Sequence, residues 1–387
     1  MEKRLAGSEG EREMLHLVRR RLPDGAVGRI EPFVAHTSPS LVAAAHDLAL
    51  VVAGLLGLWH PSMGLVVAAF VTGSLLLEGA GRTSPLRALL PMSASYNFVV
   101  RQKVPDAQGT IVFAAPLDAP PWEPLDLPWV RNARPMRLTF GAGALITGIL
   151  AFRTLAEPWG PRSFELYVGA LGVLGVGMLL GVIAHRRPGE GKDDGSGSAA
   201  LLELMRRLQR DPVPGLDVWF AFTGCARAYQ GGMDSFLTLH RRTFRGPVLV
   251  VAVADVAGQP LAAITAEGPL FTQSHRPTGP ALVERLRWAG VQVPSIDLAG
   301  ATDARAAFVL KYRALAFKGG DEKPSSEAAA RAVDVFETIT RWFADDLARV
   351  AVNRPTLKEL AKTTLPPDIT DEEEPDQGDP HTNEALR

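Results

Sequence analysis

The sequence predicts an α/β fold, a mixed sheet flanked by helices, into which two pairs of membrane-spanning helices are inserted. Three observations support this fold class. Apolar residues make up 47% of the 387 residues and the mean hydropathy is +0.07, which is high for a purely soluble protein. Four long apolar runs occur in two pairs. Strand-like and helix-like segments alternate in the C-terminal half.

Residues 1–40 are assigned to the start of the α/β domain. Apolar residues recur at helical spacing among charged ones between Gly7 and Leu22, which predicts an amphipathic surface helix. These apolar residues are Met14, Leu15, Val18 and Leu22. The run Gly28–Val34 predicts a short strand.

Residues 41–80 are predicted to form a transmembrane hairpin. Leu41–Trp59 and Met63–Leu77 are almost wholly apolar, and the turn His60–Ser62 joins them. Each run is at the short end of the roughly 17 to 25 residues that a bilayer requires. A buried core hairpin of a soluble domain is the alternative. The glycine and alanine content and the high apolarity favour the membrane.

Residues 81–137 return to the α/β domain. Ser95–Arg101 and Gly109–Ala115 predict two strands, and a proline-rich loop follows from Ala119 to Pro135.

Residues 138–186 are predicted to form the second transmembrane hairpin. The apolar runs Leu138–Phe152 and Leu166–Ala184 flank the turn Pro158–Pro161 and bring the number of predicted spans to four.

The distribution of arginine predicts the orientation of the spans. Because both spans of a hairpin return to the side they left, every soluble segment lies on one face of the membrane. That face carries Arg19, Arg20, Arg21, Arg82, Arg87, Arg101, Arg131, Arg134, Arg137, Arg186 and Arg187. The opposite tips carry only His60, Arg153, Glu157, Arg162 and Glu165. The positive-inside rule therefore predicts a bacterial-type inner-membrane protein with a cytoplasmic soluble domain.

His46 and Asp47 lie inside the first apolar run. Ionisable residues within a span can mark an intramembrane polar site. Both lie within two turns of the start of the run, so residues at the membrane interface are the favoured interpretation.

Residues 187–352 predict the remainder of the α/β domain. Strands are predicted at Asp217–Thr223, Pro247–Ala254, Leu261–Ala266 and Ala314–Phe317. Helices are predicted at Ser198–Arg210, Met233–Arg241, Pro280–Ala289, Ala304–Leu310 and Ser326–Val350. The acidic tail, residues 353–387, lacks apolar spacing and is predicted to be disordered.

Composition excludes several classes of function. The net charge of −1 and the absence of a basic run interleaved with aromatic residues argue against a nucleic-acid partner. The one cysteine, Cys225, excludes an intrachain disulfide and a cysteine-based zinc cluster. A buried inert thiol is favoured over a nucleophile, because no histidine is near Cys225 in the sequence. His240 and His275 are predicted to be surface residues.

The stretch Gly191–Asp255 holds the candidate site. Asp193 and Asp194 lie in a glycine-serine loop that leads into a helix, and Asp255 follows the strand Pro247–Ala254. Carboxylates at strand ends and helix starts are what a hydrolase uses to hold metal ions. The segment Gly195–Ser198 resembles a phosphate-binding loop only superficially, because it lacks the lysine and the preceding strand.

Six segments carry a resemblance to a known family. They are Gly7–Arg12, Ser95–Val100, Gly109–Asp118, Asp193–Glu203, Ala221–Arg227 with Gly232, and Ala254–Gly258. Their order and spacing resemble the co-catalytic di-zinc aminopeptidase family, which also holds glutamate carboxypeptidase, glutaminyl cyclase and the transferrin receptor ectodomain. The resemblance implies the zinc-aminopeptidase-like mixed sheet, in a degenerate member interrupted by the two hairpins.

The resemblance implies that several metal-site positions have lost their ligands. The position of the first metal-binding histidine is Pro116, the general-base glutamate position is Ala226, and the following metal-binding glutamate position is Arg227. The final histidine ligand has no counterpart in Gly319–Ala330, which contains no histidine.

The resemblance also implies that three acidic positions remain. Asp193 matches the aspartate that bridges the two zinc ions, and Asp255 matches a ligand of one of them. Asp118 matches the aspartate that orients the first histidine. Two metal ligands therefore remain. Zinc hydrolysis requires at least three protein ligands and a base, so this set is too small.

Arg227 suggests what replaces the metal. A guanidinium repels a divalent cation, and we predict that it occupies the metal's place and neutralises Asp193 and Asp255 through charge-assisted hydrogen bonds. The alternative is that Arg227 points to solvent, while Asp193 or Asp194 is the N-cap of the helix that follows.

Two classes of function follow. In the first, the chain is a membrane-anchored pseudopeptidase that binds a partner protein, as the transferrin receptor's peptidase-like domain does within its family, and no cofactor is expected. In the second, it is an active membrane-bound zinc-dependent aminopeptidase or related hydrolase with a reorganised metal site. The expected partners are the lipid bilayer and a protein, with no nucleic acid.

Overall fold

The computed structural model describes residues 4–119, 135–155, 161–184, 195–275, 278–298, 300–320 and 322–352. Asp193, Asp194 and the tail 353–387 lie outside the described residues, as does most of the proline-rich loop. The predictions for these segments therefore stay predictions.

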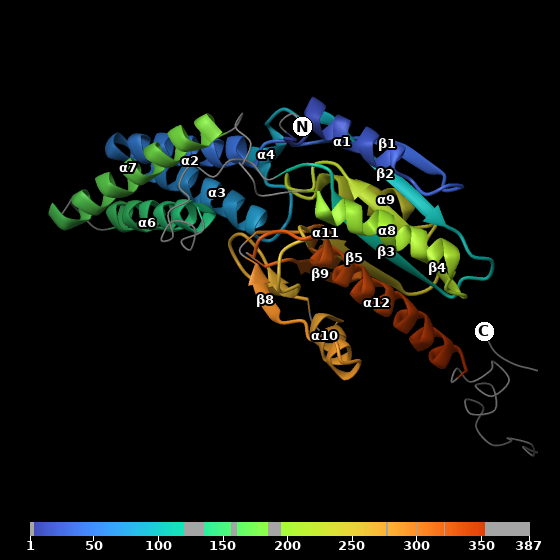
Figure 1. Ribbon diagram of the computed structural model, residues 1–387. Helices are drawn as coiled ribbons and strands as arrows, with labels where there is room; N and C mark the ends of the chain where they lie inside the picture. Colours follow the sequence, from blue (N-terminus) through green and yellow to red (C-terminus); the bar gives the residue numbers. More distant parts are fainter. Residues whose placement is uncertain are drawn as a thin grey trace, which may run out of the picture.

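The described chain forms a helical bundle beside an α/β domain (Figure 1). The bundle consists of α2 (Pro39–Trp59), α3 (Pro61–Gly79), α6 (Pro135–Leu155) and α7 (Pro161–Ala184). All four helices are long and apolar enough to cross a membrane. Each begins at a proline two to five residues before the predicted start, because proline fits the first turn of a helix, where its missing N–H has no partner to lose.

Small residues let the bundle helices approach one another closely. A Cβ on Gly64 of α3 would lie 2.5 Å from the Cα of Gly57 on α2. The Tyr167 hydroxyl of α7 donates a hydrogen bond to the Gly54 carbonyl of α2. Close backbone contact of this kind is typical of helices that associate in lipid.

His46 and Asp47 are buried between the helices of the bundle. The Nε2 atom of His46 lies 3.0 Å from Ser74 Oγ on α3, and Asp47 packs against Gly177 of α7, where a Cβ would lie 2.7 Å from its Oδ2 atom. Both side chains thus contact neighbouring helices at residues that lie far away in the sequence, while their depth at the membrane interface stays a prediction. The arrangement fits an interior polar cluster.

The α/β domain is built on one mixed sheet. The described strands are β1 (Gly28–Ala35), β2 (Ser93–Gln102), β3 (Gly109–Pro116), β4 (Leu216–Thr223), β5 (Val248–Val253), β6 (Ala262–Glu267), β7 (Gln273–Ser274), β8 (Ser295–Leu298) and β9 (Arg313–Lys318). Their order is β1-β2-β4-β3-β5-β9-β6-β7, and β8 pairs with β6. Strands β4, β3, β5 and β9 are parallel, whereas β1 and β2 run antiparallel to their neighbours. Strand β6 runs antiparallel to β9 and β7 and parallel to β8.

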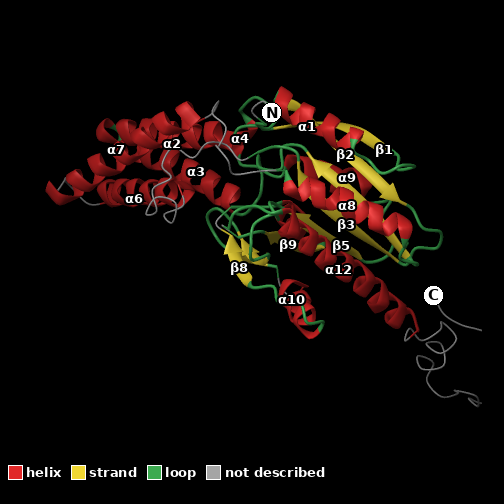
Figure 2. Ribbon diagram, in the orientation of Figure 1, coloured by secondary structure: helices red, strands yellow, loops and turns green. Residues whose placement is uncertain are grey.

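Helices cover both faces of this sheet (Figure 2). They are α1 (Glu9–Arg20), α8 (Ser196–Arg210), α9 (Gly231–His240), α10 (Thr278–Trp288), α11 (Asp303–Val309) and α12 (Ser326–Val352). The short α4 (Pro85–Ala88) contacts α2 and α3 of the bundle instead. Side chains of α1, α8, α10 and α12 pack on one face, and those of α9 and α11 pack on the other. The predicted fold class, a mixed sheet flanked by helices, is therefore confirmed. The four-residue α4 and the strands β7 and β8 were not predicted.

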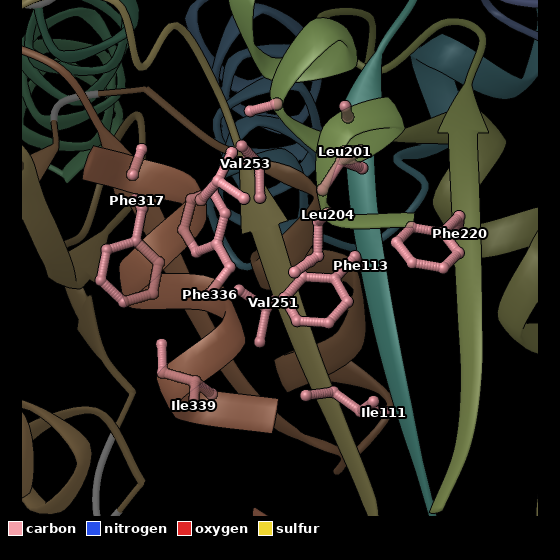
Figure 3. Packing of buried hydrophobic residues seen from close by; sticks show 14 of the residues in the cluster. Ile111, Phe113, Leu201, Leu204, Phe220, Val251, Val253, Phe317, Phe336 and Ile339 are labelled. Atoms are coloured by element: carbon pink, nitrogen blue, oxygen red, sulfur yellow. The ribbon is translucent and has the colours of Figure 1, made fainter. Parts of the chain in front are cut away.

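Aromatic side chains fill the core beneath α8 and α12 (Figure 3). The ring of Phe113 on β3 stacks on Phe220 of β4 at 6.0 Å and contacts Phe336 of α12 at 6.1 Å. Because these residues alternate with side chains that face α9 and α11, the parallel strands are buried on both faces. Because these strands are parallel, their carboxyl ends meet at one edge of the sheet.

Candidate functional site

Three parallel strands deliver the candidate site residues to one edge of the sheet. Strand β3 lies between β4 and β5. Asp118 follows β3, the segment 224–230 follows β4, and Asp255 follows β5. Open parallel sheets bind their ligands at this carboxyl edge. Residues 224–230 are called the β4–α9 loop below.

The β4–α9 loop has a strained backbone. Cys225, Tyr229 and Gln230 have φ angles of 49°, 60° and 53°. Residues other than glycine seldom adopt this left-handed backbone conformation, which persists only where the surroundings enforce it. The contacts that enforce it come from three buried side chains beneath the loop.

Asn97 on β2 holds both ends of the loop. Its Oδ1 atom accepts a hydrogen bond from the Gly224 N–H at 3.1 Å, and its Nδ2 atom donates to the Gly232 carbonyl at 2.8 Å. Glycine is required at both positions, because a Cβ on Gly224 would lie 2.3 Å from Ser95 Oγ and one on Gly232 would lie 2.2 Å from the Gly224 carbonyl oxygen.

Glu11 on α1 is the second side chain beneath the loop. Its buried carboxylate accepts hydrogen bonds from the N–H groups of Cys225 (2.9 Å) and Gly7 (3.2 Å) and from the Ser95 hydroxyl. Burial raises the pKa of Glu11, while the hydrogen bonds from Ser95 and Cys225 oppose that rise.

Asp118 is the third buried side chain beneath the loop. Its Oδ1 atom accepts a hydrogen bond from the Ala226 N–H at 2.9 Å, and its Oδ2 atom accepts one from the Arg227 N–H at 3.0 Å. Burial, and then the nearby Glu11 carboxylate, raise the pKa of Asp118 well above its usual range. Both oxygens of this carboxylate thus serve to position the backbone of the loop.

Arg227 and Asp255 lie at the surface of the site. The Arg227 Nη2 atom is 3.6 Å from the Asp255 Oδ2 atom, and the two side chains are 19% and 24% exposed. An ion pair therefore stands at the carboxyl edge of the sheet. The predicted contact between Arg227 and Asp193 lies outside the described residues.

The loop that carries Asp255 is held by the start of α8. The Ser196 hydroxyl oxygen accepts hydrogen bonds from the N–H groups of Val256 (2.8 Å) and Ala257 (3.2 Å). Gly197 permits this approach, because a Cβ there would lie 2.5 Å from a carbonyl oxygen at the end of β5. The glycine and serine residues of this segment are explained by packing.

Helix α8 begins at Ser196, two residues earlier than predicted. Its N-cap is Gly195, which has a φ angle of 74° and makes no side-chain cap hydrogen bond. The N-cap position is therefore Gly195, and the alternative prediction of a cap by the Asp193 or Asp194 side chain lies outside the described residues. Glycine takes the N-cap because the chain needs a left-handed residue to enter the helix here.

Asp303 at the start of α11 is a buried site residue that the sequence did not indicate. The Thr223 hydroxyl at the end of β4 donates a hydrogen bond to its Oδ2 atom at 2.6 Å. Burial raises the pKa of Asp303 to about 6, although the Thr223 hydrogen bond and the Arg227 charge lower it.

The remaining predicted positions offer no reactive group. Pro116 ends β3 without a side-chain donor atom, and Ala226 is buried. Cys225 is buried as predicted, and burial together with the Glu11 and Asp118 carboxylates raises the pKa of its thiol. A nucleophile requires the thiolate form, which these surroundings disfavour at Cys225.

The prediction that His240 and His275 lie on the surface is wrong. The Nε2 atom of His240 lies 2.9 Å from Glu31 Oε1, and that of His275 lies 3.1 Å from Glu267 Oε1; both rings are buried. A carboxylate beside each ring makes its burial tolerable: Glu31 is 209 residues from His240, whereas Glu267 is near His275 in the sequence.

Within the described ranges, no group of three or more His, Cys, Asp or Glu side chains is placed to hold a metal ion. Asp193, which the resemblance assigns as the bridging ligand, lies outside those ranges.

Comparison with known proteins gives structural likenesses alone. No protein-family model and no curated protein matches the chain. A glutaminyl cyclase from Fimbriiglobus ruber is 13% identical with a TM-score of 0.47, over 88% of this chain and 89% of that chain. A Zn-dependent exopeptidase from Parabacteroides distasonis is 11% identical with a TM-score of 0.43, over 89% and 92%. A zinc aminopeptidase from Bacillus subtilis is 14% identical with a TM-score of 0.37, and the match covers 64% of this chain but only 50% of that chain.

Proposed function

We propose that this chain is a membrane-anchored, peptidase-like protein that does not hydrolyse peptides and acts by binding a partner protein. The ion pair between Arg227 and Asp255 carries the proposal. By the family resemblance, Arg227 would take the position of a metal-binding glutamate, so a fixed cation would replace a donor atom there. The chain would then be a degenerate relative of the zinc aminopeptidases.

The described residues do not fit a zinc ion. Zinc needs at least three donor side chains, and hydrolysis needs a base as well. Pro116 and Ala226 supply no donor atom, and both Asp118 oxygens accept backbone hydrogen bonds. Asp255 is paired with a guanidinium, which repels a divalent cation.

The orientation in the membrane is part of the proposal. Four spans with every soluble segment on the arginine-rich face would anchor the α/β domain at the cytoplasmic side of a bacterial-type inner membrane. A cysteine placed at position 387 and one at Pro158, each in the Cys225→Ala background, should label from opposite sides of sealed membranes. Labelling of both positions from the same side would contradict this topology.

Metal analysis of the purified full chain tests the loss of catalysis. We expect well under one zinc per chain and no aminopeptidase turnover. An Arg227→Glu substitution should raise zinc binding, because it replaces a cation with a carboxylate beside Asp255. Arg82→Glu makes the same charge change on an exposed side chain and should leave zinc binding unchanged. One zinc per chain, together with turnover that Asp193→Ala abolishes, would instead identify an active membrane-bound aminopeptidase.

A partner protein is sought by crosslinking in native membranes. Proteins captured from wild-type membranes but lost in an Arg227→Glu variant would bind at the carboxyl edge of the sheet. Capture of none beyond those found with an unrelated four-span protein would contradict a binding role.

A further inference from the structure

A pocket of about 130 Å³ lies where the first hairpin meets the α/β domain. Four segments line it: residues just after α3, α4, the β4–α9 loop with the start of α9, and α11. Its polar lining consists of Thr83, Arg87, Tyr229, Gln230, Asp234 and Arg305. We call it the junction pocket. Helices α4 and α11 beside it lie between the bundle and the sheet in Figure 1.

Arg305 is a buried cation in this pocket, and no carboxylate of the described residues forms an ion pair with it. The residue is only 4% exposed, and its Nη2 atom donates a hydrogen bond to the Gly79 carbonyl. Its Nε atom has no hydrogen-bond partner among the residues that the structure describes. Burial lowers the pKa of Arg305, and Glu267 and Glu78 oppose this only through longer-range attraction. A buried charge without a paired group is costly, so an anion supplied from outside would stabilise it.

Arg87 is the second guanidinium in the pocket, but its charge is already balanced. Its Nε atom lies 3.1 Å from Glu78 Oε1, and its Nη2 atom donates to Thr83 Oγ1 at 2.9 Å. Its planar group stacks 4.3 Å above the Tyr229 ring. Arg87 therefore builds the wall of the pocket, and Arg305 remains the group that would bind an anion.

We propose that the junction pocket binds the phosphate of an amine-bearing phosphodiester, with Arg305 on the phosphate and Asp234 on the amine. A guanidinium presents a planar fork that matches phosphate oxygens. The pocket adjoins the end of α3 at Gly79, and the ends of spans lie at the depth of lipid headgroups. Asp234 is exposed on α9, where its carboxylate attracts an ammonium and disfavours a phosphate of higher negative charge.

The proposal is independent of whether the sheet edge is catalytic. It assigns a ligand to the junction, where Arg305 also bonds the end of α3. A phosphodiester there would tie α3, α9 and α11 together. The ligand is either the headgroup of a membrane lipid or a free phosphodiester, and both share this chemistry.

Calorimetry on the full chain in a maltoside detergent tests the proposal. The probes are dihexanoyl phosphatidylethanolamine and soluble glycerophosphoethanolamine. Arg305→Gln should weaken binding of whichever probe binds by about ten- to a hundredfold, the worth of a charged hydrogen bond. Arg82→Gln, an exposed arginine in the same segment, should leave binding unchanged. Equal binding of both probes identifies a free ligand, and binding of the lipid alone identifies a headgroup.

Two further variants separate a lost site from a damaged fold. Ala306→Leu fills the pocket and keeps both arginines, so it should also abolish binding. Asp234→Asn should weaken binding of the amine probe by about two- to fivefold while strengthening binding of inorganic phosphate by a similar factor. A damaged fold would not strengthen binding. No binding of either probe by the wild-type chain, or equal losses in the Arg305 and Arg82 variants, would overturn the proposal.

Discussion

The two sides of the β4–α9 loop differ sharply. Beneath it lies an inner layer of Glu11, Asn97 and Asp118, all buried, and each accepts hydrogen bonds from backbone N–H groups. Above it lies the outer pair, Arg227 and Asp255, which is partly exposed and 3.6 Å apart. The inner layer fixes the shape of the loop, whereas the outer pair fixes only the charge that the loop presents.

The inner layer therefore determines the stability of the loop, and the outer pair determines the charge that it presents. Removing an inner acceptor leaves buried N–H groups unpaired, which is costly. Changing an outer residue exposes its partner to water, which is cheap. Substitutions in the inner layer should therefore cause large losses of stability, and substitutions in the outer pair should cause small ones.

The largest effect is expected for Asp118→Ala. The substitution leaves the Ala226 and Arg227 N–H groups without acceptors, so we expect a loss of about 3 kcal/mol or more in the free energy of unfolding of the α/β domain. Asp118→Asn keeps one acceptor and should lose less. Chemical unfolding of the full chain in detergent measures the losses.

Hydrogen exchange locates the damage. Amides of the β4–α9 loop should exchange faster in Asp118→Ala, and those of α12 should change little. Asp345→Ala, on the exposed side of α12, is the control and should change stability by less than about 0.5 kcal/mol. If Asp118→Ala lowers the free energy of unfolding as little as the Asp345→Ala control does, Asp118 does not stabilise the β4–α9 loop.

An intermediate effect with a defined pH dependence is expected for Asp303. Its pKa rises from 3.8 to about 6 on folding, because it is buried. The folded state therefore binds the proton more tightly, so the stability it contributes is fully present below pH 3.8 and is lost as the pH rises through about 6. This change corresponds to about 3 kcal/mol.

Asp303→Asn removes that titration. The variant should match the wild type near pH 4 and exceed its stability at pH 7.5 by about 1 to 3 kcal/mol, because the amide can still accept the Thr223 hydrogen bond. Unfolding curves at both pH values provide the measurement. A variant that is less stable than the wild type at pH 7.5 would show that the ionised carboxylate stabilises this edge of the sheet.

The sequence predicted the large elements because their signal is local. Helix α12 was predicted at Ser326–Val350 and runs to Val352, and β3 and β4 were predicted to within one residue at each end. Hydrophobic periodicity carries this information within each segment. The short α4, β7 and β8 depend on their neighbours; β8, for example, forms only by pairing with β6.

The site was predicted in outline only, and the reason is sequence distance. Asp118, Arg227 and Asp255 follow strands that the sequence showed, so their common edge could be foreseen. The roles of Glu11 and Asp303 depend on partners 214 and 80 residues away, Cys225 and Thr223. The same reason explains the buried His240, whose partner Glu31 is 209 residues away.

The smallest effect is expected at the outer pair, and a double-mutant cycle measures it. Arg227→Gln, Asp255→Asn and the double variant should give a coupling energy of about 0.5 to 1 kcal/mol, because both side chains are partly exposed and 3.6 Å apart. The coupling should shrink in high salt, which screens exposed charges. A coupling energy above about 3 kcal/mol that salt leaves unchanged would show that the pair stabilises the loop as strongly as the buried inner layer does. Arg227 would then be part of the scaffold, and the charge at the sheet edge could not be altered without unfolding the loop that presents it.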